Sequence, residues 1–271
     1  MKKLILFIVT ILSLCISVAK ANGLEVGIDA YQAGNYAQAL ELLRPVADQG
    51  IAEAQNYVGK IYEEGRNNIT RDYKEALKWY SLAAEQGHAE AQVALGLMYA
   101  RGFGVTRDYK KVIKWFRLAA EQGYVDAQFR LGVMYAKGKV IIQDYMEAVK
   151  WFRVLAKQGF AEAQKKLGMM YRDGQGVSQD SIRAHMWFNL AENQGVSSAK
   201  KKRIKIAETM TPLQIAVAKK MARYCEKKDY KKCERSLLAQ SRHSQITILN
   251  PMQYHFSPNT KRNSMRVIIR V

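Results

Sequence analysis

One phrase of about 36 residues occurs four times in this chain, at a nearly constant spacing. Each copy opens on Ala-Gln and continues with a glycine, a tyrosine, a second glycine, an aspartate, a tryptophan and a final glycine. The tryptophans lie 36 residues apart, at Trp79, Trp115, Trp151 and Trp187. A period of this length indicates supersecondary units that stack on one another, rather than one closed hydrophobic core.

Each unit predicts two helices. Apolar residues follow the Ala-Gln pair at helical spacing, and the aspartate stands where the N-cap of a second helix is expected. A glycine in the middle of the first helix costs about 1 kcal/mol relative to alanine, so its recurrence predicts a close approach by a neighbouring helix. We expect the tryptophans to be buried anchors. The predicted fold is all-α, an α/α superhelical solenoid of helix-turn-helix repeats.

The register of the repeats divides the chain into segments. They are a signal peptide at 1–21, an N-terminal capping half-repeat at 22–51, repeats at 52–88, 89–124, 125–160 and 161–196, basic C-terminal capping helices at 197–240, and a tail at 241–271. The half-repeat is expected because Ala39 and Gly50 each lie 37 residues before their counterparts, Ala76 and Gly87. A disordered segment, a partner-binding peptide and a frame-shifted extension all remain open for the tail.

The first residues have the layout of a secretory signal peptide. Lys2 and Lys3 precede an apolar run over residues 4–18, and residues 19–21 fit a cleavage site. The alternative is an uncleaved membrane anchor, but the run is shorter than the roughly 20 residues that a spanning helix needs. We therefore expect export to the periplasm or the cell exterior, with no transmembrane span after cleavage.

Only two cysteines, Cys225 and Cys233, follow the expected cleavage site. In an exported chain they favour a disulfide. A continuous helix would hold their Cα atoms about 12 Å apart, beyond the roughly 7 Å that a bridge allows, so the chain must turn, and Asp229 is a suitable position. Two free thiols are the alternative. A zinc site with His243 and His255 has a spacing unlike structural zinc sites, so no metal is expected.

Positive charge is concentrated in the C-terminal part of the chain. The net charge is +19, and residues 199–271 carry 18 Lys and Arg against 4 Asp and Glu, or +14. The clusters are Lys200-Lys201-Lys202-Arg203, Lys219-Lys220, Lys227-Lys228 and Lys231-Lys232. This segment suits an anionic envelope component or an acidic partner. Nucleic acid is a common partner of such charge, but export argues against it. The alternative is a solvated basic surface with no specific partner.

The repeated phrase resembles the Sel-1-like repeat, a relative of the tetratricopeptide repeat. The resemblance covers residues 52–196 at nearly every motif position and residues 29–51 more loosely. Residues 184–191 look like the last repeat of bacterial members, and residues 210–223 look like their terminal capping helix. The resemblance implies an adaptor that holds other proteins together. One exported subgroup binds or slowly hydrolyses β-lactams, but its mark is a cysteine pair within each repeat, which this chain lacks.

Partner binding is expected at positions that vary between repeats. These positions lie opposite the packed face of the first helix, at about 100° per residue. They are Asn56, Lys60, Val93, Leu97, Phe129, Val133, Lys165 and Met169. The outer repeats are mostly polar there and the middle two are apolar, which suits a partner helix or an extended peptide on a concave face. The alternative is that these side chains pack against the next repeat.

The chain shows no catalytic constellation. It has no Gly-x-Ser-x-Gly elbow, phosphate loop or His-Glu-x-x-His motif. His185 takes a position that Leu77, Ile113 and Val149 hold in the other repeats, so we expect a packing residue rather than a base. The sequence predicts a non-enzymatic exported scaffold without a cofactor. The alternative is an envelope hydrolase or a factor that binds β-lactams or peptidoglycan.

Overall fold

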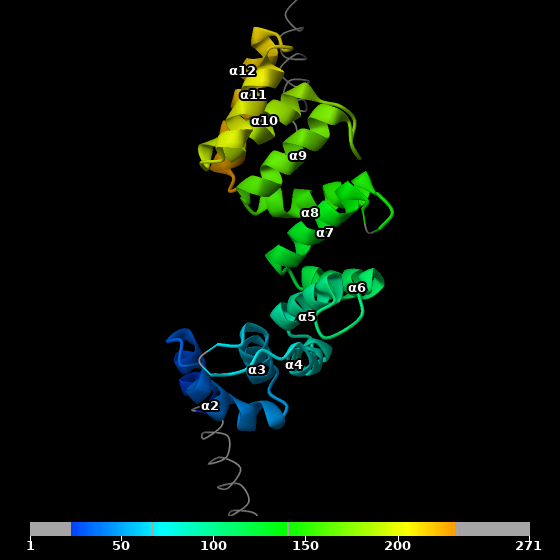
Figure 1. Ribbon diagram of the computed structural model, residues 1–271. Helices are drawn as coiled ribbons and strands as arrows, with labels where there is room; N and C mark the ends of the chain where they lie inside the picture. Colours follow the sequence, from blue (N-terminus) through cyan, green and yellow to red (C-terminus); the bar gives the residue numbers. More distant parts are fainter. Residues whose placement is uncertain (1–22, 67, 140, 231–232, 234–271) are drawn as a thin grey trace, which may run out of the picture.

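The computed structural model describes residues 23–66, 68–139, 141–230 and 233. The expected signal peptide and the tail from residue 241 lie outside the described residues. Within them all regular structure is helical, and the helices follow one another in an elongated stack from α2 to α12 (Figure 1). The predicted all-α solenoid is confirmed. In this part of the chain no helix is long and apolar enough to cross a membrane.

The helices pair in sequence order. After a helix over residues 23–32 come α2 (Tyr36–Asp48), α3 (Ala52–Glu64), α4 (Tyr73–Glu85), α5 (Ala89–Arg101), α6 (Tyr109–Glu121), α7 (Val125–Lys137), α8 (Tyr145–Lys157), α9 (Ala161–Asp173), α10 (Ser181–Asn193), α11 (Ser197–Ala207) and α12 (Pro212–Lys227). The last two helices both pack against α10. The segment expected as a half-repeat, residues 22–51, contains two helices, and the helix over residues 23–32 packs Gly27 against Leu43 of α2.

The second helix of each repeat begins at the predicted aspartate. The carboxylates of Asp72, Asp108, Asp144 and Asp180 accept hydrogen bonds from backbone amides of the first helical turn. Each of these helices ends at a glycine with φ of +89° or +90°, a left-handed conformation that L side chains rarely adopt. These local signals confirm the predicted starts and ends of the second helices.

The mid-helix glycines make room for aromatic rings. A Cβ atom added to Gly59, Gly96, Gly132 or Gly168 would lie 2.6–2.8 Å from the ring of Tyr80, Phe116, Phe152 or Phe188, respectively. The predicted close approach is therefore confirmed, and the group that approaches is a side chain of the second helix in the same repeat. All four rings are at least 97% buried, since their exposed fractions are 1%, 3%, 1% and 0%.

The expectation that all four tryptophans are buried is wrong for two of them. Trp79 and Trp187 are buried, with exposed fractions of 2% and 0%, whereas Trp115 and Trp151 are half-buried. Trp115 packs against the core formed by α4 and α5, and it also lines a surface hollow. The residue after each tryptophan is thus the main anchor of its own repeat.

A row of buried glutamines joins consecutive repeats. The side chains of Gln55, Gln92, Gln128 and Gln164 donate to the carbonyl oxygens of Ala47, Ala84, Ala120 and Ala156, respectively, over 2.9–3.2 Å. Three of the four also accept a hydrogen bond from the glutamine that caps the next second helix, namely Gln86, Gln122 or Gln194. Gln128 Oε1 has no such donor. The recurrent glutamine therefore satisfies buried polar groups between repeats.

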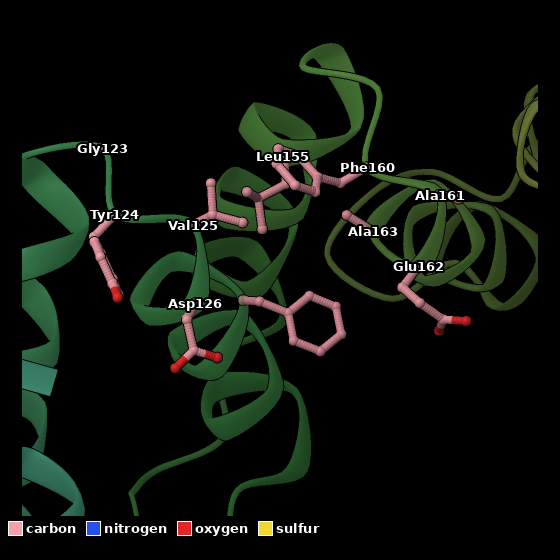
Figure 2. Close-up of a pocket in the computed structure, with 10 residues that line it drawn as sticks. Gly123, Tyr124, Val125, Asp126, Leu155, Phe160, Ala161, Glu162 and Ala163 are labelled. Carbon is pink, nitrogen blue, oxygen red and sulfur yellow. The ribbon is translucent and has the colours of Figure 1, made fainter. Parts of the chain in front are cut away.

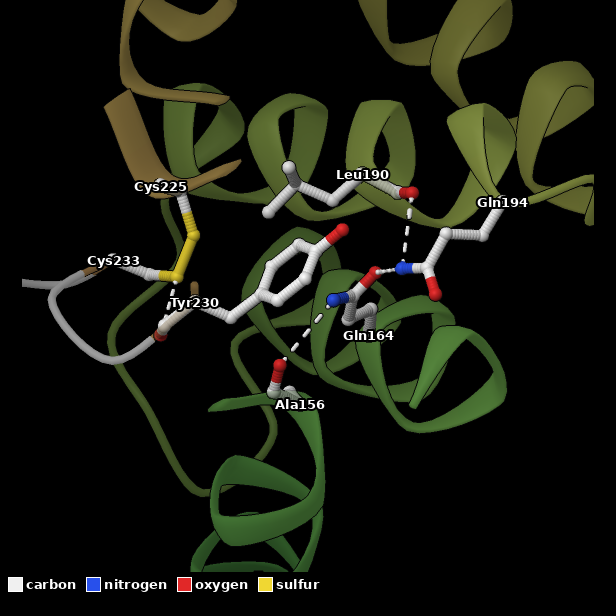
Figure 3. The surroundings of a disulfide bond; sticks show 7 residues. All are labelled: Ala156, Gln164, Leu190, Gln194, Cys225, Tyr230 and Cys233. Carbon is white, nitrogen blue, oxygen red and sulfur yellow. Dashed lines mark hydrogen bonds between the residues drawn. A yellow bond between two sulfur atoms is a disulfide. The ribbon is translucent and has the colours of Figure 1, made fainter. Parts of the chain in front are cut away.

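The C-terminal end of the stack is closed by a disulfide. Cys225 and Cys233 are joined, and their Cα atoms lie 4.6 Å apart. The chain turns between them at Asp229 and Tyr230, which have φ of 46° and 61°. This turn places Tyr230 beside Leu190 and Gln164 of the last repeat (Figure 3).

Candidate functional site

Three of the predicted binding residues line one apolar hollow. Leu97 of α5 and Phe129 and Val133 of α7 surround a volume of about 490 Å³. Its floor is formed by Val112 and Phe116 of α6, which are buried. Because the floor belongs to the packed core, the shape of this hollow is fixed by the fold of the middle repeats.

A second apolar hollow, of about 770 Å³, adjoins the first, and Figure 2 shows the residues that line it. Phe129 lines both, and the second hollow continues over Val125, Leu155 and Phe160 toward α9. We call the two hollows together the central groove, defined by Leu97, Phe116, Val125, Phe129, Val133, Leu155 and Phe160. Phe129 is held in place by an edge-to-face contact with the Phe152 ring, with centroids 5.7 Å apart.

Charges at the rim of the central groove are mostly paired. Arg130 Nε lies 2.6 Å from Asp126 Oδ2, and Lys165 Nζ lies 2.5 Å from Glu162 Oε2. Burial, together with Glu90 and Asp126, raises the pKa of the Tyr124 phenol, so this hydroxyl keeps its proton and remains a donor at neutral pH. The groove is therefore an apolar surface with a polar, nearly neutral edge.

The predicted residues of the first repeat, Asn56 and Lys60, contact the next repeat. Asn56 is fully buried and donates to Glu90 Oε2 over 2.8 Å, and Lys60 Nζ lies 2.9 Å from the same oxygen. Burial alone would raise the pKa of Glu90, but its contacts with Lys60 and Asn56 hold it below the usual range. For these two residues the contacts favour the alternative, packing between repeats.

Three other predicted residues also make contacts within the solenoid. Val93 is 5% exposed and belongs to the core around Phe116. Lys165 Nζ lies 3.2 Å from Ser198 Oγ, so it joins α9 to α11, and Met169 packs against the C-terminal core. Helical periodicity places these side chains opposite the first packed face, but a solenoid helix packs on both neighbours, which leaves a smaller free face than predicted.

The comparisons with known proteins agree with this architecture. The family model described as the Sel1 repeat matches residues 19–51, 52–88, 89–124, 125–160 and 161–196. The chain belongs to the Sel1 repeat family. The first match covers the N-terminal unit, so the protein has five Sel1 repeats. Proteins built from Sel1 repeats typically serve as protein-interaction scaffolds.

Two crystal structures of bacterial proteins are similar to this Sel1 repeat chain. The Sel1 repeat protein from Oxalobacter formigenes has 33% identity and a TM-score of 0.61, and the match covers 67% of this chain and 72% of that one. The protein c5321, a protective antigen present in uropathogenic Escherichia coli strains, has 30% identity and a TM-score of 0.66. That match covers 89% of this chain but only 50% of c5321. No curated protein matches the chain.

Beyond the Sel1 repeats, α11 and α12 present part of the basic segment. The predicted lysines exposed there are Lys200, Lys201, Lys219, Lys220, Lys227 and Lys228, whereas Lys231 and Lys232 lie outside the described residues. Arg203, by contrast, is committed to an ion pair in which its Nε lies 2.5 Å from Glu192 Oε2. The exposed lysines are the part of the predicted cluster that remains accessible to an anionic partner.

His185 is a packing residue of the last Sel1 repeat. Its side chain is fully buried, and neither ring nitrogen has a hydrogen-bond partner. Burial, followed by the positive charges of Arg203 and Lys219, lowers its pKa to about 4. The imidazole is therefore neutral at physiological pH and has no contact with solvent. Among the described residues no group of three or more His, Cys, Asp or Glu side chains is placed to hold a metal ion.

Proposed function

We propose that this protein is a non-enzymatic scaffold that binds a helix or an extended peptide of a partner protein in the central groove. The observation that carries the proposal is the solvent-accessible apolar surface of Leu97, Phe129 and Val133 above a buried floor. An apolar strip of this kind on a solenoid suits the apolar face of a partner helix, or alternate side chains of an extended chain.

The groove suits a polypeptide better than a reaction centre. Its lining is mostly apolar, and the two acidic groups at its rim, Asp126 and Glu162, are paired with Arg130 and Lys165. A hydrolase would need a carboxylate or a nucleophile held ready beside the substrate. We therefore propose that the apolar wall of the groove supplies most of the affinity for the partner, and that the charged pairs at its edge orient the partner.

We propose that the protein acts in the cell envelope or outside the cell. The Cys225–Cys233 disulfide supports this location, since such bonds persist in oxidising compartments. The signal-like sequence of residues 1–21 points the same way. The exposed lysines of α11 and α12 add an electrostatic contact with an anionic envelope component.

Affinity capture from the envelope fraction of the source cells tests the groove. The purified protein is compared with the Leu97→Asp/Phe129→Asp variant and with Leu213→Asp, a control on α12 where the side chain is 74% exposed. We expect a partner that the groove variant loses, that the control keeps, and that survives high salt. A partner kept by the groove variant but released by salt would move the function to the basic segment. Turnover of nitrocefin or digestion of peptidoglycan by the purified protein would contradict the non-enzymatic proposal.

A further inference from the structure

The turns that end the second helices differ in what covers them. Gly50, Gly87, Gly123, Gly159 and Gly195 all have φ near +90°. Four of them have open space where a side chain would stand. At Gly159 that space is occupied, because an added Cβ would lie 3.2 Å from two atoms of the Tyr230 ring. The C-terminal turn thus fills one copy of a position that recurs along the solenoid.

The filled copy shows which chemistry suits this position. The Tyr230 ring packs beside Leu190, and the hydrogen-bonded pair Gln164–Gln194 lies next to it (Figure 3). Leu190 is fully buried there. The same cap reaches the end of α10, where Asn193 Nδ2 donates to Glu226 Oε1 over 2.6 Å. An aromatic side chain on a tight turn therefore completes this surface.

The same position is open two repeats earlier. A hollow of about 560 Å³ is lined by Gly87, Gln92, Trp115, Leu118 and Gln122, which are the counterparts of Gly159, Gln164, Trp187, Leu190 and Gln194. We call it the open aromatic site. Gln122 donates to Gln92 over 2.9 Å, as Gln194 does to Gln164. Leu118, however, is 37% exposed. The framework is conserved between the two copies, but the described residues place no ring over the earlier one.

The helix ends around the two copies differ in charge. In the filled copy Lys157 and Asn193 end the two helices, and the cap supplies Glu226 before its turn and Asp229 within it. In the open aromatic site the corresponding residues are Glu85 and Glu121, and Lys114, whose Nζ lies 4.9 Å from the centroid of the Trp115 ring, also lines the hollow. Neither glutamate has an ion-pair partner within the described part of the chain. An occupant of this site is expected to carry cations where the cap carries carboxylates.

We propose that the open aromatic site binds a tyrosine or phenylalanine presented on a basic turn of a partner protein. The ring would take the position that Tyr230 takes over Gly159, against Leu118 and Trp115, and flanking lysines or arginines would pair with Glu85 and Glu121. The site shares no residue with the central groove, so this proposal stands independently of the one above.

The probe is a peptide copied from the cap of this chain. It spans residues 224–234, is closed by the Cys225–Cys233 disulfide, and carries Glu226→Lys and Asp229→Lys to match the two glutamates. Its binding to the full chain is followed by fluorescence anisotropy. We expect saturable binding that becomes weaker by about tenfold or more when the peptide also carries Tyr230→Ala, because the alanine buries far less apolar surface than the ring.

Protein variants locate the binding. Leu118→Asp is expected to weaken it by a similar factor, while Val154→Asp, at the same position of the next repeat and 41% exposed, leaves it unchanged. The variant Glu85→Lys/Glu121→Lys alters only the charges at the rim. It should weaken binding of the lysine peptide and strengthen binding of the peptide that keeps the original Glu226 and Asp229. The proposal is overturned if no binding appears at millimolar peptide, if the tyrosine makes no difference, or if Leu118→Asp and the charge reversal both leave affinity unchanged.

Discussion

Gly96 and Phe116 are in such close contact that a methyl group on Gly96 would lie 2.6 Å from Phe116 Cε1. Three other repeats show the same pairing of a glycine on the first helix with a ring on the second. The contact defines how closely the two helices of a repeat approach, because the ring lies directly over the glycine.

Gly96→Ala is therefore expected to destabilise the protein, although alanine is the better helix former by about 1 kcal/mol. Overpacking a buried ring costs about 1–3 kcal/mol, so we expect a net loss of up to about 2 kcal/mol in the free energy of unfolding, measured in urea. In the Phe116→Leu background the same substitution should cost less. Stabilisation of the wild-type background by Gly96→Ala would show that the ring moves freely.

Much of the fold follows from signals of this local kind. The aspartate caps and the left-handed glycines are predictable because each acts within a few residues of chain. The exposure of Trp115 and the burial of Asn56 are not predictable from local sequence, since both depend on how the neighbouring repeat packs. Helical periodicity placed Leu97, Phe129 and Val133 on the free face of the first helices. It also placed Val93 there, although this side chain is buried in the core. The contact of Tyr230 with Gly159 cannot be predicted from the sequence either, because it depends on the backbone angles of a turn that no sequence motif indicates.

The buried glutamines predict a graded effect of substitution. Gln92→Met removes the donor to Ala84 and the acceptor for Gln122, and leaves polar groups unsatisfied at a cost of about 1–3 kcal/mol. Gln128→Met is the matched control, because Gln128 donates to Ala120 but accepts no hydrogen bond. We expect the smaller loss for Gln128→Met in urea unfolding. Equal losses would mean that the bond between glutamines contributes nothing measurable.

His185 predicts a specific dependence of stability on pH. Its pKa is about 4 in the folded protein, below the ordinary value of 6.5, so the unfolded chain binds the proton more readily. Above pH 6.5 the neutral imidazole leaves the free energy of unfolding at its full value. As the pH falls toward 4, the free energy of unfolding decreases by about 3 kcal/mol. His185→Leu, which restores the residue type of Leu77, should flatten this part of the curve of unfolding free energy against pH. Parallel curves for the two proteins would contradict the assignment.

The disulfide is expected to stabilise the C-terminal cap. Cross-linking a loop of this length restricts the unfolded chain by about 2–3 kcal/mol. Cys225→Ser/Cys233→Ser should unfold at a lower temperature than the wild type, and Tyr230 should become more accessible to chemical modification. Reductant should lower the unfolding temperature of the wild type alone. An equal response of the double variant to reductant would point to another cause.

The central claim is that partners bind over the middle repeats, in the groove around Phe129. The most direct measurement is site-specific photo-crosslinking in the source cells, with a photoreactive residue at Val133 in one variant and at Leu213 in another. We predict that Val133 becomes cross-linked to one partner polypeptide, and that Phe129→Asp abolishes this product while Leu213 gives no such product. Cross-linking of the same partner from Leu213 but not from Val133 would contradict the claim and place binding on the C-terminal cap.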